Sequence, residues 1–428
     1  MELKKYKLAD IADFNKSSIS KSETFKEIIY LDTSSITENV VSGTVVMNTK
    51  EAPSRAQRKV TNNTIIYSTV RPRLKHYGIL SRPQNNFIIS TGFTTIDIKD
   101  LYKDKIDPRY LYLLLTQPTI TDYIGNIADT AVSAYPSINP SDLSSLCFMF
   151  PDYDIQKTIA DIWNNYDRKI ELNRAINQNL EAMAKQLYDY WFVQFDFPNE
   201  DGKPYKSSGG AMVWNEKLKR RIPEGWNVMS INEICTSCRG VSYGKDDLLS
   251  DSNGVLVLRG NNIENNRIVY DSNVAFVPND FVSEEQHIKE GDIIMTMSSG
   301  SKAHVGKCAM FHKDSEHTFG AFLSKFTPKK ELRYMTFLFL TSEYFKSLIT
   351  AFCNGTGINN LTNQTFDDVL LVLPDKNKTR MFESKVNNLF TMIGNNEENM
   401  RKLTKQRDEL LPLLMNGQVS VNSDLSLD

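Results

Sequence analysis

The stretch YDYWFVQFDFPNEDGKPYKSSGG, from Tyr188 to Gly210, lies near the middle of the chain and changes character abruptly. Six of its first ten residues are aromatic, and a run rich in Pro, Gly, Ser and Lys follows at once. Crowded aromatic residues are typical of the end of a buried element, whereas the polar run is typical of a connector. The sequence therefore predicts that the chain divides here.

The composition is that of a globular protein. At 428 residues the chain is longer than a domain with a single hydrophobic core usually is, and this length favours two or three domains. Hydrophobic residues make up 40% and charged residues 24% of the chain, and no apolar run approaches the ~18 residues of a membrane span. The N-terminal MELKKYKLADIADF is charged where a signal peptide needs an apolar segment, and five irregularly spaced cysteines fit a reducing compartment. We therefore expect a cytoplasmic protein without a structural disulfide.

A long internal repeat runs through the chain. AVSAYPSINPSDLSSLCFMFPD ends at Asp152, and TGINNLTNQTFDDVLLVLPD ends 223 positions later, at Asp375. Upstream, NNTIIYSTVRPRLKHYGIL from Asn62 resembles EGDIIMTMSSGSKAHVGKCAMF from Glu290, and EIIYLDTSSITENVV from Glu27 resembles GVLVLRGNNIENNRIV from Gly254. The sequence thus predicts two copies of one architecture.

Downstream of each Pro-Asp, apolar residues recur at alternating steps of four and three, as in a coiled-coil seam. The first seam is Ile159, Trp163, Tyr166, Ile170, Asn173, Asn177, Leu180, Ala184, Leu187 and Trp191, and the second is Phe382, Val386, Leu389, Ile393, Asn396, Met400, Leu403, Arg407, Leu410 and Leu414. Each predicted helix is ~50 Å long. Asn173 and Asn396 occupy the same seam position, and a buried polar pair there would fix the register of two mutually packed helices. The alternative is two separate helices whose Asn residues face water.

Each globular half mixes short β-type runs, such as TIIYSTV and GVLVLRG, with a helical stretch, PRYLYLLLTQPTITDYI or LRYMTFLFLTSEYFKSLI. This mixture predicts an α+β fold for each copy. The predicted division is a first globular domain at 1–152, a long helix at 153–195, a connector at 196–225, a second globular domain at 226–375, a second long helix at 376–416 and a disordered tail at 417–428.

Motifs for catalysis are weak. The run Gly240-Val-Ser-Tyr-Gly244-Lys245-Asp246 has too few residues between its glycines for a phosphate loop and ends in an acid, and neither a dinucleotide fingerprint nor the Asn-Pro-Pro-aromatic motif of amino-methyltransferases is found. Asp375, Glu383 and Lys385 formally match the Pro-Asp and Glu-x-Lys pattern of metal-dependent nucleases, but two of them fall within the predicted helix. No catalytic residue and no metal site is predicted.

Cys235 and Cys238 have the spacing of a zinc or redox pair. A structural zinc site needs a second pair, and the chain offers only single cysteines and three histidines nearby, His304, His312 and His317. A buried structural role is therefore favoured.

Nucleic-acid binding has better support. Between Lys50 and Arg82, eight Lys or Arg accompany a single acid, Glu51. Such side chains neutralise phosphate, and Arg can also recognise guanine. The residues predicted to bind DNA in the first copy are Arg55, Arg58, Lys59, Arg71, Arg73, Lys75, His76 and Tyr77, with Tyr67 alongside. The alternative is a solvated basic face.

The second copy has a different charge. From Ile222 to Pro374 it has 13 Lys or Arg and 18 acids. The residues that could face phosphate are Arg239, Lys245, Arg259, Asn261, Lys302, His304 and Lys307. We expect the two halves to recognise different partners or sequences.

The chain resembles the DNA specificity subunit of type I restriction-modification systems. The resemblance lies in two divergent globular modules, each followed by a long helix, and is sharpest in the central NRAINQNLEAMAKQLYDYWFVQFDFPNEDGKPYKSSGGAMVWNEKLKRRIPEGW and in QRDELLPLLMNGQV near the C-terminus.

The resemblance implies two target recognition domains joined by an antiparallel coiled coil. Each would recognise one half of an asymmetric bipartite site in double-stranded DNA, and the helices would act as a ruler between the half-sites. It also implies two methyltransferase subunits and restriction (translocase and endonuclease) subunits as partners, no membrane, and no cofactor in this chain, since S-adenosylmethionine, ATP and Mg²⁺ would belong to the partners.

Subunit docking on the helices is a further hypothesis. The residues assigned to it are Leu180, Leu187, Tyr190, Trp191, Phe192, Leu403, Leu410 and Leu414. The alternative for the aromatic members is packing against the other helix of this chain. For the whole chain the alternatives are a self-sufficient metal-dependent nuclease and a coiled-coil scaffold that does not bind DNA.

Overall fold

A computed structural model of the chain describes residues 3–20, 25–130, 135–250, 253–270, 274–355, 360–415 and 417–418. The predicted disordered tail, 417–428, therefore lies almost wholly outside the described residues. The chain divides into two compact units, residues 1–169 with 402–428, and residues 170–401. Each unit holds one globular module and part of each long helix. No helix in the described ranges is long and apolar enough to cross a membrane.

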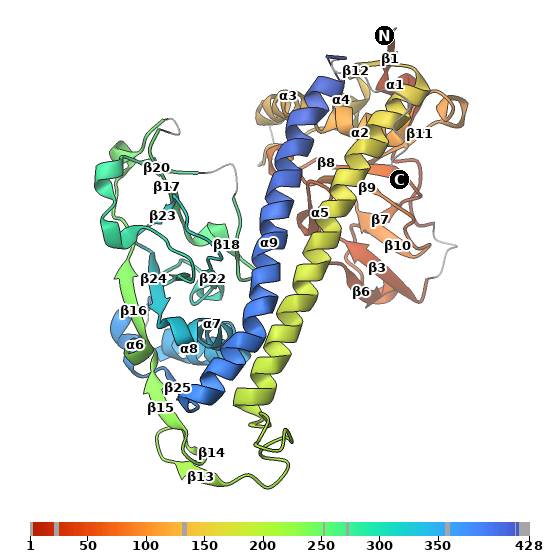
Figure 1. Cartoon of the computed structure of the whole chain (residues 1–428). Helices are drawn as coiled ribbons and strands as arrows, with labels where there is room; N and C mark the ends of the chain where they lie inside the picture. The colour runs from red at the N-terminus through yellow and green to blue at the C-terminus, as the bar shows by residue number, and fades with distance from the viewer. Residues whose placement is uncertain are drawn as a thin grey trace. The chain divides into compact units, whose positions relative to one another are not determined.

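The first module occupies the unit that contains the N-terminus (Figure 1). Strands β2, β11, β8 and β9 form one sheet in that order, strands β6, β3, β10 and β7 form a second, and β1 pairs with β12. The strands are β1 (Lys4–Lys7), β2 (Ala12–Phe14), β3 (Glu27–Leu31), β4 (Ile36–Thr37), β5 (Val40–Val41), β6 (Val45–Asn48), β7 (Ala56–Lys59), β8 (Thr64–Ser68), β9 (Tyr77–Leu80), β10 (Phe87–Ser90), β11 (Phe93–Ile98) and β12 (Cys147–Phe150). The helices are α1 (Leu8–Ile11), α2 (Pro108–Leu115), α3 (Pro118–Asp129) and α4 (Pro140–Ser144).

The second module lies in the other unit and has the same plan. Strands β16, β24, β21 and β22 form one sheet, strands β20, β17 and β23 form another, and β15 pairs with β25. The strands are β13 (Met212–Asn215), β14 (Arg220–Pro223), β15 (Asn227–Ser230), β16 (Cys235–Arg239), β17 (Val255–Leu258), β18 (Ile263–Glu264), β19 (Arg267–Ile268), β20 (Phe276–Val277), β21 (Ile293–Thr296), β22 (Cys308–Met310), β23 (Thr318–Phe319), β24 (Leu323–Pro328) and β25 (Leu370–Leu373). The helices are α6 (Ile231–Ile234), α7 (Arg333–Leu340) and α8 (Glu343–Gly355).

The predicted repeat and α+β fold are confirmed strand by strand. The sheet β2-β11-β8-β9 has its counterpart in β16-β24-β21-β22, and the parallel pair β3–β10 has its counterpart in β17–β23. A buried cross-strand hydrogen bond is also repeated with its partners exchanged. In the first module Thr64 of β8 donates to Asp97 of β11, and in the second Thr327 of β24 donates to Asp292, the residue just before β21.

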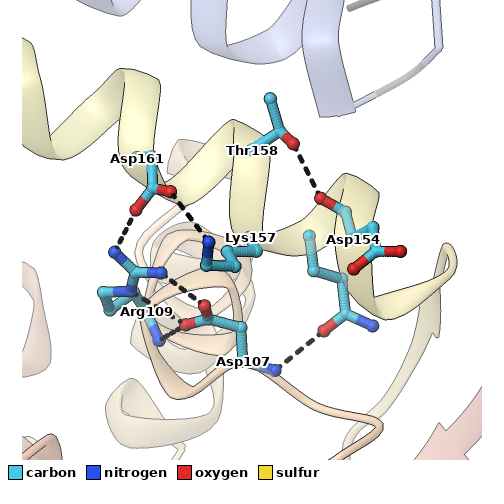
Figure 2. A network of polar contacts seen from close by, with 7 residues as sticks. Asp107, Arg109, Asp154, Lys157, Thr158 and Asp161 are labelled. Carbon is cyan, nitrogen blue, oxygen red and sulfur yellow. Dashed lines mark hydrogen bonds and ion pairs between the residues drawn. The ribbon is translucent and has the colours of Figure 1, made fainter. Parts of the chain in front are cut away.

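Each module is fixed to the long helix that follows it by contacts of a carboxylate on that helix. In the first, Arg109 at the start of α2 forms a bidentate pair with Asp107 and a second pair with Asp161 of the helix α5 (Figure 2). In the second, Glu383 of the helix α9 accepts hydrogen bonds from the backbone N–H groups of Tyr334 and Met335 at the start of α7, at 3.1 and 2.8 Å. Carboxylates near a helix N-terminus satisfy its free N–H groups and its dipole.

The long helices are α5 (Tyr153–Tyr188) and α9 (Lys376–Met415) (Figure 1). In the unit that holds the first module, Asp167 of α5 pairs with Arg407 of α9 at 2.7 Å, and Ile159 and Leu414 share one core. Ile159 lies with Leu414 and the later Asp167 pairs with the earlier Arg407, so the helices run antiparallel.

In the unit that holds the second module, the same antiparallel order is carried by Asn177 and Asn396. The Asn396 Nδ2 donates to the Asn177 Oδ1 at 2.8 Å, and the fully buried Asn177 donates to the backbone oxygen of Ile393. The structure thus contains a polar pair in the seam, as predicted, but the partner of Asn396 is Asn177 rather than Asn173. These contacts within each unit are consistent with mutual packing of the helices and favour it over the alternative of two separate helices.

After Tyr188, α5 continues as a π-helical turn, Asp189–Val193. The aromatic stretch fills the core of this unit, where Trp191 is 1% exposed and its ring lies 5.5 Å from that of Phe382 at the start of α9. Phe192 lies 4.7 Å from the same ring, and Phe197 stacks on Trp226. The aromatic residues therefore close the helix pair within this chain, and the polar run that follows leads into the hairpin β13–β14.

Candidate nucleic-acid interface

In the first module, the predicted basic residues lie on the β8–β9 loop and on β7, and most of them are held by contacts within the module. Arg73 lies across Gly125 of α3, where an added Cβ would come within 2.9 Å of its side chain. Its guanidinium bonds to Asp122 at 3.3 Å, to Asp129 at 3.1 Å and to Asn126 at 2.7 Å. Arg73 therefore fixes the loop to α3, where acids match its charge, and its predicted contact with DNA stays a prediction.

Three other predicted residues of this loop also have internal roles. Lys75 pairs with Glu38 at 2.6 Å, and the Nδ1 of His76 lies 2.7 Å from the backbone oxygen of Ile36. Tyr77 is 4% exposed and stacks on Tyr67, so neither phenol reaches the surface. Burial raises the pKa of Tyr67 to about 12. The β9 strand turns the Tyr77 side chain into the core, and this burial does not favour the predicted contact of Tyr77 with DNA.

Arg55 and Arg71 remain at the surface, near the β10–β11 turn. In this turn, the Gly92 carbonyl accepts a hydrogen bond from Thr69 N, two residues before Arg71. Thr91 N donates to the carbonyl of Arg55 itself. Arg55 pairs with the half-buried Asp32 and keeps 56% of its side chain exposed. Arg71 is exposed, has a left-handed backbone (φ 48°) and lies 4.7 Å over the ring of Tyr135.

The two remaining predicted residues of β7 are half-buried. The Arg58 Nε donates to the backbone oxygen of Phe93 at 2.9 Å, and burial lowers the Arg58 pKa. Lys59 follows it on the same strand and is also half-buried. Among the predicted cations in the described part of the module, Arg55 and Arg71 are thus the exposed ones near the turn, and we call this surface the first-module turn face.

Replacing Arg71 with alanine is expected to weaken binding of duplex DNA and to reduce the slope of log K against log salt by about one, because one phosphate contact is lost. Arg73→Ala should leave that slope unchanged and lower the free energy of unfolding by about 1 kcal/mol, since its ion pairs are half-exposed. Fluorescence anisotropy at several salt concentrations and urea unfolding separate the two effects. Equal slope changes in both variants would contradict this assignment.

In the second module, a surface pocket of about 370 Å³ lies at the corresponding place. Asn261 and His304, both predicted, line it, together with Thr296, Ser298, Ser299 and Phe322. Lys302 and His304 belong to the short turn Lys302–His304, and Lys307 Nζ lies 3.0 Å from His304 Nδ1. The structure therefore brings the predicted β21–β22 loop together with Asn261.

The other predicted residues of this module are more dispersed. Arg239 is exposed and its Nε donates to the backbone oxygen of Ala321, next to Phe322. Arg259 is half-buried, its backbone N–H donating to Asn262 Oδ1. Lys245 lies on a separate exposed turn, Lys245–Asp247, beside two acids, and does not line the pocket.

The two modules present the same turn with different side chains. In the first, Thr69 N donates to the carbonyl of Gly92, and in the second Met297 N donates to the carbonyl of Phe322 at 2.9 Å. Phe322 is 70% exposed, whereas its counterpart is a glycine. Phe322 could not be singled out from the sequence, because a single aromatic residue next to a strand is more often part of a core.

The acids of the nuclease alternative have structural roles. Asp375 accepts hydrogen bonds from the backbone N–H groups of Asn377 and Lys378 at the start of α9. Glu383 is bound to α7, and burial raises its pKa to about 6. Among the described residues, no group of three metal-binding side chains is found. The nuclease alternative is therefore not supported.

The cysteine pair has no geometry for a shared metal. Cys235 and Cys238 are three apart on strand β16, so their side chains point to opposite faces. Cys235 is 7% exposed, and burial raises its thiol pKa to about 12. This agrees with the structural role that the sequence favoured.

The residues assigned to subunit docking are mostly unavailable. Leu180, Trp191, Phe192 and Leu414 are buried within this chain, and Leu187, Tyr190, Leu403 and Leu410 are half-buried. Docking through the buried four is not supported, because they already pack against core residues of this chain. Exposed apolar side chains on α5 are instead Leu172, Ile176 and Met183, which lie outside the seam with α9 and are 53%, 44% and 54% exposed.

Comparison with known proteins agrees with this architecture. The family model of the type I restriction modification DNA specificity domain matches residues 1–182 and 223–391, one match in each half. The type I restriction enzyme HindI specificity subunit of Haemophilus influenzae is 25% identical over 97% of this chain and 99% of its own length, and the EcoKI specificity subunit of Escherichia coli is 31% identical over 46% of this chain and 41% of its own.

Among solved structures, the S subunit of a type I restriction-modification system from M. genitalium matches 97% of this chain and 96% of its own, with 16% identity and a TM-score of 0.53. At this identity the likeness supports the fold alone. The family model, by contrast, covers most of the sequence in two matched copies, and this chain therefore belongs to the type I restriction-modification DNA specificity family.

Proposed function

We propose that this chain is the DNA-recognising subunit of a type I restriction-modification complex and that each module recognises one half of an asymmetric bipartite target in double-stranded DNA. The observation that carries the proposal is the duplication of one module with unlike surfaces at equivalent positions. One turn face carries Arg55 and Arg71 around a glycine, and the other carries Phe322 beside a pocket whose described lining residues include no Lys, Arg, Asp or Glu. Different side chains at equivalent positions of the same fold favour recognition of different half-sites.

The subunit would itself be non-catalytic and would hold two methyltransferase subunits and the restriction subunits. The exposed apolar side chains Leu172, Ile176 and Met183 of α5 suit helix-to-helix docking of such a partner, because their spacing places them on one side of the helix and their exposure to water is costly. S-adenosylmethionine, ATP and Mg²⁺ would be bound by the partners, in keeping with the missing sequence motifs. Such a complex would act in the cytoplasm.

The test is a genome-wide map of methylated adenines in the native host, with this gene intact and then deleted. Deletion is expected to abolish one bipartite methylated motif and to leave other methylation unchanged, which would also reveal both half-sites. An unchanged map, with the gene expressed and the purified complex inactive on host DNA, would overturn the proposal. Binding of duplex DNA that is weak and insensitive to salt would instead favour a scaffold without DNA binding.

A further inference from the structure

The pocket of the second module is built from hydrogen-bonding groups of Asn, Ser, Thr and His side chains beside an exposed aromatic ring. Its walls come from the turn after β17, where Asn261 lies, and from the loop after β21, which contributes Ser298, Ser299 and His304. None of the described residues that line it is an Asp or a Glu. It therefore offers hydrogen bonds of both kinds without the strong charge that binds phosphate alone.

Thr296 supplies an unused hydrogen-bonding group to this pocket. It is 0% exposed, and its hydroxyl has no hydrogen-bond partner among the described residues. The equivalent residue of the first module, Ser68, donates instead to the backbone oxygen of Val70 at 2.9 Å. A buried hydroxyl without a partner destabilises the fold, and a base that enters the pocket and opens this part of its wall would satisfy the hydroxyl.

Phe322 lies at the rim of the same pocket, on the turn between β23 and β24. With 70% of its surface exposed, the ring contributes little to the core of the module. Its backbone is held by hydrogen bonds from Met297 N at 2.9 Å and Ser298 N at 3.3 Å. The ring is therefore presented to solvent from a fixed turn beside the pocket.

We propose that Phe322 and Thr296 determine the base specificity of the second module, as an extension of the function proposed above. Phe322 packs against a base of the half-site, and Thr296, with the pocket wall, hydrogen-bonds to the edge of that base pair. Apolar and hydroxyl contacts of this kind discriminate base pairs without phosphate neutralisation. This assignment agrees with the acidic balance of the second copy, 13 Lys or Arg against 18 acids from Ile222 to Pro374.

The test uses the complex of this subunit with its methyltransferase subunit and duplexes that contain the target or single base-pair substitutions in either half-site. For the wild type, a wrong base pair should lower kcat/KM for methylation by about tenfold or more. In Phe322→Ala and in the nearly isosteric Thr296→Val, a wrong base pair at one or two positions of a single half-site should lower kcat/KM by less than about threefold. We call this loss of kcat/KM the penalty. Penalties in the other half-site, and the salt dependence of binding, should not change, because neither side chain carries charge.

Phe281→Ala is the matched control, since Phe281 is 38% exposed in the same module but does not line the pocket. It should keep the wild-type penalties in both half-sites. Wild-type penalties in Phe322→Ala and Thr296→Val would overturn the inference and leave the proposed function intact. A wild-type complex without any sequence preference would instead overturn the proposed function. Thr296→Val should fold at least as stably as the wild type, because it removes a buried hydroxyl without a partner.

Discussion

Replacing Trp191 with alanine is expected to lower the free energy of unfolding by ~3–5 kcal/mol, the usual cost of removing a large buried aromatic side chain. Trp191 is 1% exposed, and its ring contacts Phe192, Phe197 and Phe382, with centroids 5.5 to 6.3 Å away. The loss should appear as an earlier urea transition of the unit that holds the second module. Far-UV circular dichroism is the measurement, since the substitution removes a fluorescent tryptophan.

Trp214→Ala is the matched control. Trp214 is 56% exposed on strand β13, and its indole N–H donates to Glu216 at 2.9 Å. Its loss should change the free energy of unfolding by less than ~1 kcal/mol. If Trp191→Ala leaves the isolated subunit as stable as the wild type and weakens only its assembly with a methyltransferase subunit, then the ring is a docking contact and its assignment to the core is wrong.

The duplicated fold could be predicted from sequence because its signals are local and are repeated. The order of apolar and polar residues marks β8 and β9 in one copy and β21 and β22 in the other, and the seam spacing marks both helices. One long-range feature could not be predicted. The offset of 223 residues relates Asn173 to Asn396, but the residue that faces Asn396 is set by the crossing register of antiparallel helices, which places Asn177 there.

The candidate interface was predicted less completely, because charge in sequence does not show which acids the fold brings nearby. The acids that hold Arg73 lie 49 and 56 positions away, and Glu38, which holds Lys75, lies 37 positions away. The basic loop therefore contributes fewer free cations than its composition indicates. Phe322 is the opposite case, a candidate residue that the sequence does not indicate. Only the exposure of its ring distinguishes it from a core aromatic residue.

Lengthening both long helices by one heptad is expected to lengthen the unrecognised gap of the DNA target by about three base pairs, if each module recognises one half-site as proposed. Seven residues add ~10 Å of helix, and duplex DNA rises ~3.4 Å per base pair. The insertions belong between Asp167 and Asn177 in α5 and between Asn396 and Arg407 in α9, where both flanking contacts are preserved. The gap is measured by mapping methylated adenines in a host that carries the variant.

The same geometry predicts how tightly each variant binds. Three added base pairs rotate one half-site by ~100° about the duplex, whereas a heptad changes the direction of a helix by only ~20°. The one-heptad variant should therefore bind its new target less tightly than the wild type binds its own. Three heptads add ~32 Å, about nine base pairs and nearly one duplex turn, so affinity should recover. Seven residues inserted between Ser207 and Gly210, outside both helices, should leave the gap unchanged. An unchanged gap in a heptad variant that still methylates DNA would refute the helices as a ruler.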